Sequence, residues 1–280
     1  MKETGFRSIR SVAVVLTLLL GPISISKTSA GTARSVHPNP ILAFSFDHVT
    51  SSNVQDDSGS GNSYSIVAYD QNGPFTPTTG RSFVRSGNAM NFDGFQKQRI
   101  EVNGSALTVQ AFTIMADIRL HNPPNFTDPQ RWEISEKSGS YWANIRVDQG
   151  TVRPGPPFLL RVGGFFSGEG NTKYTGVTAI KAGPWQNVAF VFDNVGQTLT
   201  TYINGVFDHS EPQTGSLDPS TLHNGIDENL VVGAKHRQGG TEALQACFDG
   251  QMDNYRLFSV ALLPAEIAYF SGRPVLPLSR

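Results

Sequence analysis

The stretch that decides the fold lies near the C-terminus and reads Cys247-Phe248-Asp249-Gly250-Gln251-Met252-Asp253-Asn254-Tyr255-Arg256-Leu257-Phe258. Apolar and polar residues alternate along it, with one shift of phase at Asp253-Asn254, and the side chains of a β-strand alternate between two faces. Pro264 follows, a residue suited to the first turn of a helix, and residues 265–270 supply about two turns. The sequence therefore predicts a half-buried closing strand followed by a short helix.

The composition indicates an all-β protein. The chain has 280 residues, of which 16% are charged and 10% aromatic, with 28 glycines and 17 prolines. Few charges and many turn-forming residues are typical of a sandwich of short strands. The formal net charge of −1 provides no basic field for nucleic acid, so we exclude that class of partner.

Residues 1–30 have the pattern of a signal peptide. Basic residues come first, an almost unbroken apolar run spans Val12–Leu20, and small residues at Thr28-Ser29-Ala30 suit a cleavage site. The apolar run ends at Gly21-Pro22, short of the ~20 residues that span a bilayer. We expect cleavage after Ala30, a secreted or periplasmic location, and no transmembrane segment afterwards. The alternative is an uncleaved membrane anchor.

Cys247 is the only cysteine, so an intramolecular disulfide is excluded. Its place at the start of the closing strand favours a buried, inert thiol over a nucleophile. An exported protein without disulfides must be stabilised by its core or by a bound cation.

Several motifs resemble those of the laminin G-like domains of the concanavalin A-like lectin/glucanase group. The closing strand is similar to the pattern F-x-G-x-(I/M)-D-x-(V/Y)-R-(I/L)-(Y/F) of that family. Residues 183–193 resemble G-x-W-(H/Q)-x-V-A-x-x-(F/Y)-(D/N), and residues 199–205 resemble (L/I)-x-x-Y-(I/V)-N-G, which ends in a hairpin turn. Asp117 departs from the family, which usually has an aromatic residue there.

The resemblance covers Ile41 to about Phe270 and implies an all-β, two-sheet antiparallel jelly-roll sandwich. Turn signals separate about a dozen short strands, which agrees with two facing sheets. The predicted organisation is a signal peptide at 1–30, a linker at 31–40, one laminin G-like domain at 41–272 and a tail at 273–280.

The resemblance also implies a structural calcium ion. In such domains the first loop and the closing strand are neighbours, so Asp56 and Asp253 are predicted to share one Ca²⁺, with Asp57 and Asp47 as reserve ligands. Carboxylates in a Gly-rich turn are the hard oxygen ligands that this ion takes. The alternative is that loop N–H groups, without a metal, satisfy Asp253.

A carbohydrate-binding face is predicted on the strand at Tyr141–Val147. Trp142, Asn144 and Arg146 share one phase of that strand, and an aromatic ring beside amide and guanidinium groups suits sugars. The further candidates are Arg161, Tyr174 and His236. Trp142 is equally compatible with a place in the core.

Enzymatic alternatives stay open, although no catalytic residue is predicted. Glu133 and Glu136 are three residues apart in one strand, and a regular strand would point them to opposite faces, unlike the carboxylate pair of a glycosidase. His236, between Lys235 and Arg237, is the best histidine for a lyase. We therefore predict a secreted lectin-like module, with a polysaccharide lyase or glycoside hydrolase, or a protein-binding adhesion module, as alternatives.

Overall fold

The structure is a computed structural model that describes residues 37–82, 87–103, 107–121, 131–137, 139–147, 158–217, 229–235 and 246–272. The predicted signal peptide and tail lie outside these residues. In the described part of the chain, no helix has the length and apolar character that crossing a membrane requires.

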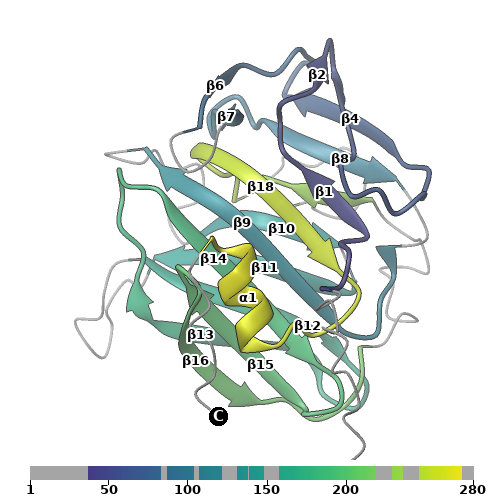
Figure 1. Cartoon of the computed structure of the whole chain (residues 1–280), viewed down its shortest axis with the longest axis vertical. Coiled ribbons are helices and arrows are strands. Elements are labelled where there is room, and N and C mark those ends of the chain that lie inside the picture. The colour runs from purple at the N-terminus through teal and green to yellow at the C-terminus, as the bar shows by residue number, and fades with distance from the viewer. Residues whose placement is uncertain are drawn as a thin grey trace, which may run out of the picture. The chain divides into compact units, whose positions relative to one another are not determined.

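Two antiparallel sheets make up the unit that begins at His37 (Figure 1). Sheet A has the order β16 (Val206–Pro212), β15 (Thr198–Ile203), β14 (Gln186–Asp193), β9 (Phe112–Leu120), β18 (Gly250–Phe258), β7 (Asn88–Phe92) and β6 (Thr79–Arg81), and β1 (Leu42–Phe44) also pairs with β18. Sheet B has the order β13 (Gly170–Ala179), β12 (Phe158–Phe166), β11 (Tyr141–Val147), β10 (Arg131–Lys137), β17 (Leu230–Val232), β8 (Arg99–Asn103), β4 (Ser65–Asp70), β3 (Asn53–Val54) and β2 (Val49–Thr50), and β5 (Gly73–Pro74) pairs with β4.

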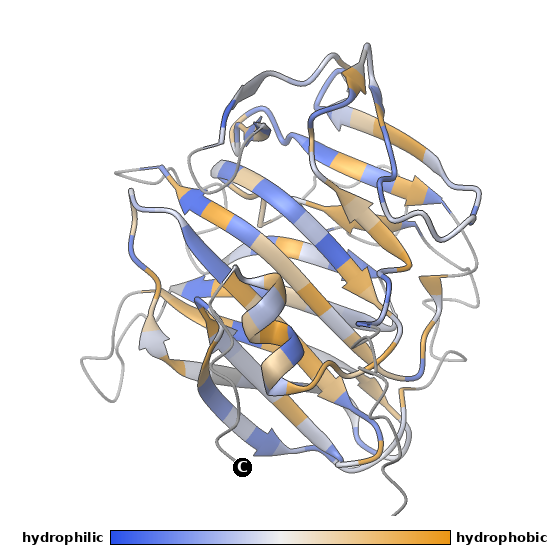
Figure 2. Cartoon of the chain, in the orientation of Figure 1, coloured by the Kyte–Doolittle hydropathy of each residue, from blue (hydrophilic) through white to orange (hydrophobic). Residues whose placement is uncertain are grey.

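The core lies between the two sheets, because strands of both sheets turn alternate apolar side chains inward. Figure 2 shows apolar residues distributed along the strands of both sheets. Phe112 of sheet A stacks on Tyr141 of sheet B with ring centroids 4.9 Å apart. The hydroxyls of Ser135 in sheet B and Tyr255 in sheet A are hydrogen-bonded across the core at 2.8 Å. The predicted all-β two-sheet sandwich is therefore confirmed.

The closing strand has the predicted shift of phase. Its pairing with β9 slips between Asp253 and Arg256, and Asn254 takes a positive φ of 49° at the slip. Asp117, the departure from the family pattern, is buried there. It accepts hydrogen bonds from Asn187 Nδ2 at 2.8 Å and Asn254 Nδ2 at 2.9 Å. Asp117 therefore makes buried polar contacts beside the bulge.

The predicted helix is α1 (Pro264–Phe270). Pro264 occupies its first turn, and the Glu266 carboxylate accepts the Leu263 N–H at 2.8 Å, which satisfies one free donor of the helix start. Ile267 is buried against the outer face of sheet A, in a cluster with Met115 and Val191 (Figure 1). This helix therefore covers part of one outer face of the sandwich.

Candidate functional site

A β-bulge in β10 sets the geometry of the candidate site. In the pairing of β10 with β11, Glu133 lies opposite Asn144 and Glu136 lies opposite Trp142, and the register shifts between Glu133 and Ser135. Residues opposite each other in a ladder project to the same face. Because Asn144 and Trp142 are two residues apart, both glutamates project to their face. The prediction that Glu133 and Glu136 point to opposite faces is therefore wrong. The bulge places one extra residue between them, and both side chains then project to the same face.

The shared face is the outer face of sheet B. Tyr141, Ala143 and Ile145 of β11 belong to the core between the sheets, so the alternate residues Trp142 and Asn144 face away from it. Trp142 is absent from the core clusters of described residues, although only 8% of its surface is exposed.

Arg161 of β12 joins these residues, because it lies opposite Asn144 in the ladder. Its guanidinium carbon lies 5.3 Å from the centroid of the Trp142 ring, in a cation–π contact. Arg146 lies farther along β11 on the same face and is exposed. The predicted residues Trp142, Asn144, Arg146 and Arg161 therefore lie together on one face.

Carboxylates complete this polar face. The Asn144 amide Nδ2 donates to the two carboxylate oxygens of Glu133 at 3.4 and 3.3 Å, and Lys235 Nζ lies 3.8 Å from Glu136 Oε1. Among the residues that the structure describes, the buried Asn144 Oδ1 has no hydrogen-bond partner. We name Glu133, Glu136, Trp142, Asn144 and Arg161 the sheet B cluster. All five residues are buried, with no more than 8% of any one of them exposed, and they hold charged, amide and aromatic groups side by side.

Two of the predicted ligand-binding residues are not part of this cluster. Tyr174 lies opposite Val162, and its ring packs against the core between the sheets. Lys173, opposite Gly163, takes the outward position on β13 instead. The prediction that Tyr174 joins the carbohydrate face is therefore wrong, because the strand phase turns it inward. His236 lies outside the described residues.

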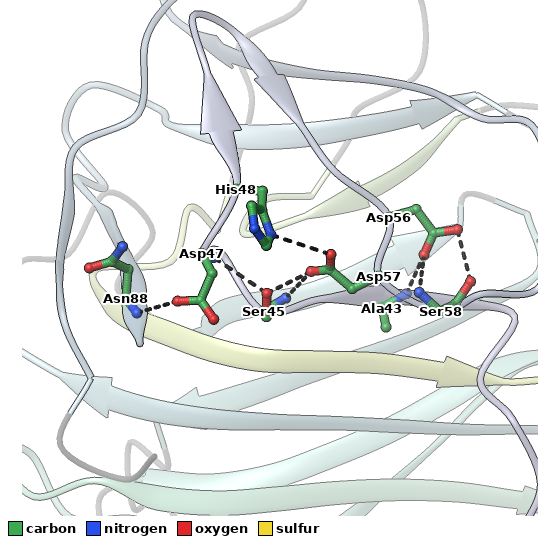
Figure 3. A network of polar contacts seen from close by, with 8 residues as sticks. All are labelled: Ala43, Ser45, Asp47, His48, Asp56, Asp57, Ser58 and Asn88. Carbon is green, nitrogen blue, oxygen red and sulfur yellow. Dashed lines mark hydrogen bonds and ion pairs between the residues drawn. The ribbon is translucent and has the colours of Figure 1, made fainter. Parts of the chain in front are cut away.

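The acidic first loop is tied to β1 by hydrogen bonds (Figure 3). Asp56 Oδ1 accepts the Ala43 and Ser58 N–H groups, each at 2.9 Å. Asp57 Oδ2 accepts the N–H of Ser45 at 3.0 Å and its hydroxyl at 2.6 Å. Within the described ranges, no group of three or more His, Cys, Asp or Glu side chains is placed to hold a metal ion. Asp56 and Asp57 therefore act as anchors of the loop.

Asp253 has a different set of charged neighbours from the one predicted. Burial, helped by the charges of Asp117 and Asp47, raises the pKa of Asp253 to about 6 against the opposing hydrogen bonds of Ser82 and the Asn254 N–H. Asp47 Oδ1 in turn accepts the Asn88 N–H at 2.7 Å (Figure 3). Asp47, rather than Asp56, is therefore the loop carboxylate whose charge acts on Asp253.

Sequence reasoning overlooked the two glutamates as members of the face. Ile134 and Ser135 both turn toward the core, and nothing in a Glu-Ile-Ser-Glu stretch marks the extra residue. The pairing of β10 with β11 supplies that information.

The family model of the concanavalin A-like lectin/glucanases superfamily named Laminin_G_3 matches residues 92–268, and the chain belongs to this family. No match is found among curated proteins.

Solved structures agree on the fold. Domain 4 of AbnA, a GH43 extracellular arabinanase from Geobacillus stearothermophilus, was solved with arabinotriose. It matches with a TM-score of 0.57 and 17% identity, over 84% of this chain and 99% of that domain. The binding domain of Paraclostridial Mosquitocidal Protein 1 matches with a TM-score of 0.57 and 13% identity, over 83% of this chain and 52% of its own. The receptor-binding domain of botulinum neurotoxin mosaic serotype C/D matches with a TM-score of 0.56 and 13% identity, over 85% of this chain and 51% of its own. This chain therefore spans about half the length of the two toxin domains. At these identities the likeness is one of fold.

Proposed function

We propose that this protein binds carbohydrate through the sheet B cluster and is exported by the signal peptide predicted at residues 1–30. The observation that carries the proposal is Asn144 Oδ1, a buried acceptor that lacks a hydrogen bond within the described residues, next to a tryptophan and an arginine. A buried polar atom without a partner costs free energy that a ligand hydroxyl or an ordered water would recover.

The chemistry of the cluster suits a sugar. A sugar that enters the buried cluster would pack its C–H groups on the apolar Trp142 ring, while Asn144 and Arg161 would supply an acceptor and donors to its hydroxyls. The exposed Arg146 extends the same face along β11. The arabinotriose complex of domain 4 of AbnA supports this ligand class for the fold.

The test is retention of the purified protein on immobilised polysaccharides. Trp142→Ala and Asn144→Ala should each weaken retention about fivefold or more, since each removes a contact worth roughly 1 kcal/mol or more. The matched control is Phe207→Ala, because Phe207 is a 58% exposed aromatic residue of β16 in the other sheet. Circular dichroism separates lost binding from unfolding. Unchanged retention by folded Trp142→Ala would contradict the proposal, and a protein that no polysaccharide retains would favour a protein partner.

A glycoside hydrolase is a second candidate, because the bulge sets Glu133 and Glu136 on one face beside Trp142. A pair of carboxyl groups on one face is what glycoside hydrolysis needs, one as acid and the other as nucleophile or base. New reducing ends from a panel of polysaccharides, abolished by both Glu133→Gln and Glu136→Gln, would establish hydrolysis. Release by either variant at the wild-type rate would exclude the pair.

We further propose that one Ca²⁺ binds beside Asp253, with Asp47 as the second carboxylate. The donor set fits in part, since a cation would offset the like charges that act on buried Asp253, although Asp47 and Asp253 each also accept one backbone N–H. Such an ion would join the end of β1 to β18 and add stability. Calcium should raise the melting temperature of the wild type and leave that of Asp253→Asn unchanged. Equal melting temperatures of the wild type in calcium and in chelator would contradict calcium binding.

A further inference from the structure

A second polar pocket opens on the other sheet. Its volume is about 300 Å³, and its lining includes Asn91, Asp93, Phe95, Gln98, His121 and Asp249. Asn91 projects from the outer face of sheet A, because its neighbours Met90 and Phe92 lie in the core. The pocket is therefore on the opposite sheet from the sheet B cluster, and its volume is at the small end of ligand sites.

One tight turn forms the aromatic side of the pocket. Asp93 Oδ1 accepts the N–H groups of Phe95 at 2.9 Å and Gln96 at 3.3 Å, and Gln98 Oε1 accepts the Asp93 N–H at 2.9 Å. Lys97 takes a positive φ of 56° to close the turn. These bonds hold the Phe95 backbone in place, and its ring is 54% exposed. A fixed, exposed ring offers an apolar surface on which a ligand can pack.

A histidine and a buried carboxylate form the opposite side. His121 Nδ1 lies 2.9 Å from Asp249 Oδ1, and the side chain of Asp249 is 2% exposed whereas that of His121 is 46% exposed. The His121 N–H also donates to the Asp249 carbonyl at 3.3 Å. The carboxylate fixes the imidazole with Nδ1 protonated, so Nε2 is left as the free ring nitrogen.

Four polar side-chain atoms around the pocket have no hydrogen-bond partner within the described residues. Asn91 Oδ1 accepts from Gln251 Nε2 at 2.6 Å, which leaves Asn91 Nδ2 as an unused donor. Gln98 uses its oxygen on the Asp93 N–H, which leaves Gln98 Nε2 unused in the same way. His121 Nε2 and Asp93 Oδ2 complete the set. Two amide donors, a carboxylate acceptor and an imidazole thus surround an exposed aromatic ring.

We propose that this pocket binds a single neutral sugar unit, as a second carbohydrate site of the protein. The sugar ring would lie on Phe95, and its hydroxyls would bond the amides of Asn91 and Gln98 and the carboxylate of Asp93. The carboxylates of Asp93 and Asp249 disfavour an acidic sugar. The ligand class rests on the proposed function, whereas the site itself rests on the pocket.

The test is an NMR titration of the full chain with glucose, galactose, mannose and arabinose, with glucuronate as the acidic comparison. At least one neutral sugar should shift the His121 imidazole and Phe95 resonances. Phe95→Ala and Gln98→Ala should each weaken that binding about tenfold. Phe207→Ala, on the same sheet, is the matched control and should bind as the wild type does.

The two carbohydrate sites are separated by crossing their variants. Trp142→Ala should leave the monosaccharide shifts intact, and Phe95→Ala should leave some polysaccharide retention. Absence of shifts at Phe95 and His121 with every neutral sugar would overturn the second site, even if polysaccharide is retained. Equal or tighter binding of glucuronate would overturn the neutral class. Loss of polysaccharide retention by Phe95→Ala alone would overturn the sheet B proposal and leave the second site standing.

Discussion

At the scale of single residues, Asp253 links charge to stability. Its pKa in the folded chain is raised to about 6, against an ordinary value of 3.8. The folded state therefore takes up a proton at a higher pH than the unfolded chain does. The resulting contribution to stability is complete below about pH 4 and is lost as the pH rises through 6.

Asp253→Asn should remove this dependence. With a chelator present, the variant should be more stable than the wild type at pH 8, by up to about 3 kcal/mol, and its free energy of unfolding should vary less between pH 4 and 7. Urea titrations across this pH range measure the difference. Asp56→Asn is a control, because it removes a different carboxylate, one that accepts the Ala43 and Ser58 N–H groups. Parallel pH profiles for wild type and Asp253→Asn would contradict the raised pKa.

At the scale of elements, α1 shows how a short helix is stabilised by packing. Ile267 is fully buried on sheet A, whereas Leu263, just before the helix, is 65% exposed. Ile267→Ala should lower the free energy of unfolding by about 2–4 kcal/mol, because it leaves a cavity, and Leu263→Ala by much less. Chemical denaturation measures both. Equal effects of the two substitutions would show that the helix contributes little to the fold.

Elements also show how far the sequence could predict this structure. The phase slip at Asp253-Asn254 was visible because it interrupts an apolar alternation, and the helix after it because Pro264 and an apolar turn follow. The bulge in β10 gave no such signal, because Ile134 and Ser135 both fit a buried position. Trp142, Asn144 and Arg161 lie on one face, as the strand phase predicted, whereas Tyr174 does not, because its phase depends on the pairing of β13 with β12.

The sequence could not predict the pocket on sheet A, for a related reason. Its histidine follows β9 and its buried carboxylate precedes β18, so they meet only because the two strands pair. Spacing along the chain carries no trace of that contact. The hydrogen bonds that hold Phe95 depend on the turn that follows β7, which the sequence pattern does not specify.

At the scale of the whole sandwich, one buried hydrogen bond joins the sheets. Ser135 and Tyr255 lie on different sheets, and burial raises the pKa of the Tyr255 hydroxyl. Tyr255→Phe and Ser135→Ala should each cost about 1–3 kcal/mol of unfolding free energy, since each leaves a buried group unsatisfied. The double variant should cost less than the sum. Strict additivity in a double-mutant cycle would show that the two hydroxyls do not interact.

The first strand of the sandwich also pairs with its last, since Leu42 lies opposite Leu257 and Phe44 opposite Tyr255. In this antiparallel pair, the chain enters and leaves at the same end of the ladder. A load applied to the two ends of the chain would act on one hydrogen-bonded residue pair of β1 and β18 at a time. The hydrogen bonds would therefore break in succession and would not share the force. The domain would then open first at the pairing of β1 with β18, and single-molecule pulling should detach β1 before the remainder opens.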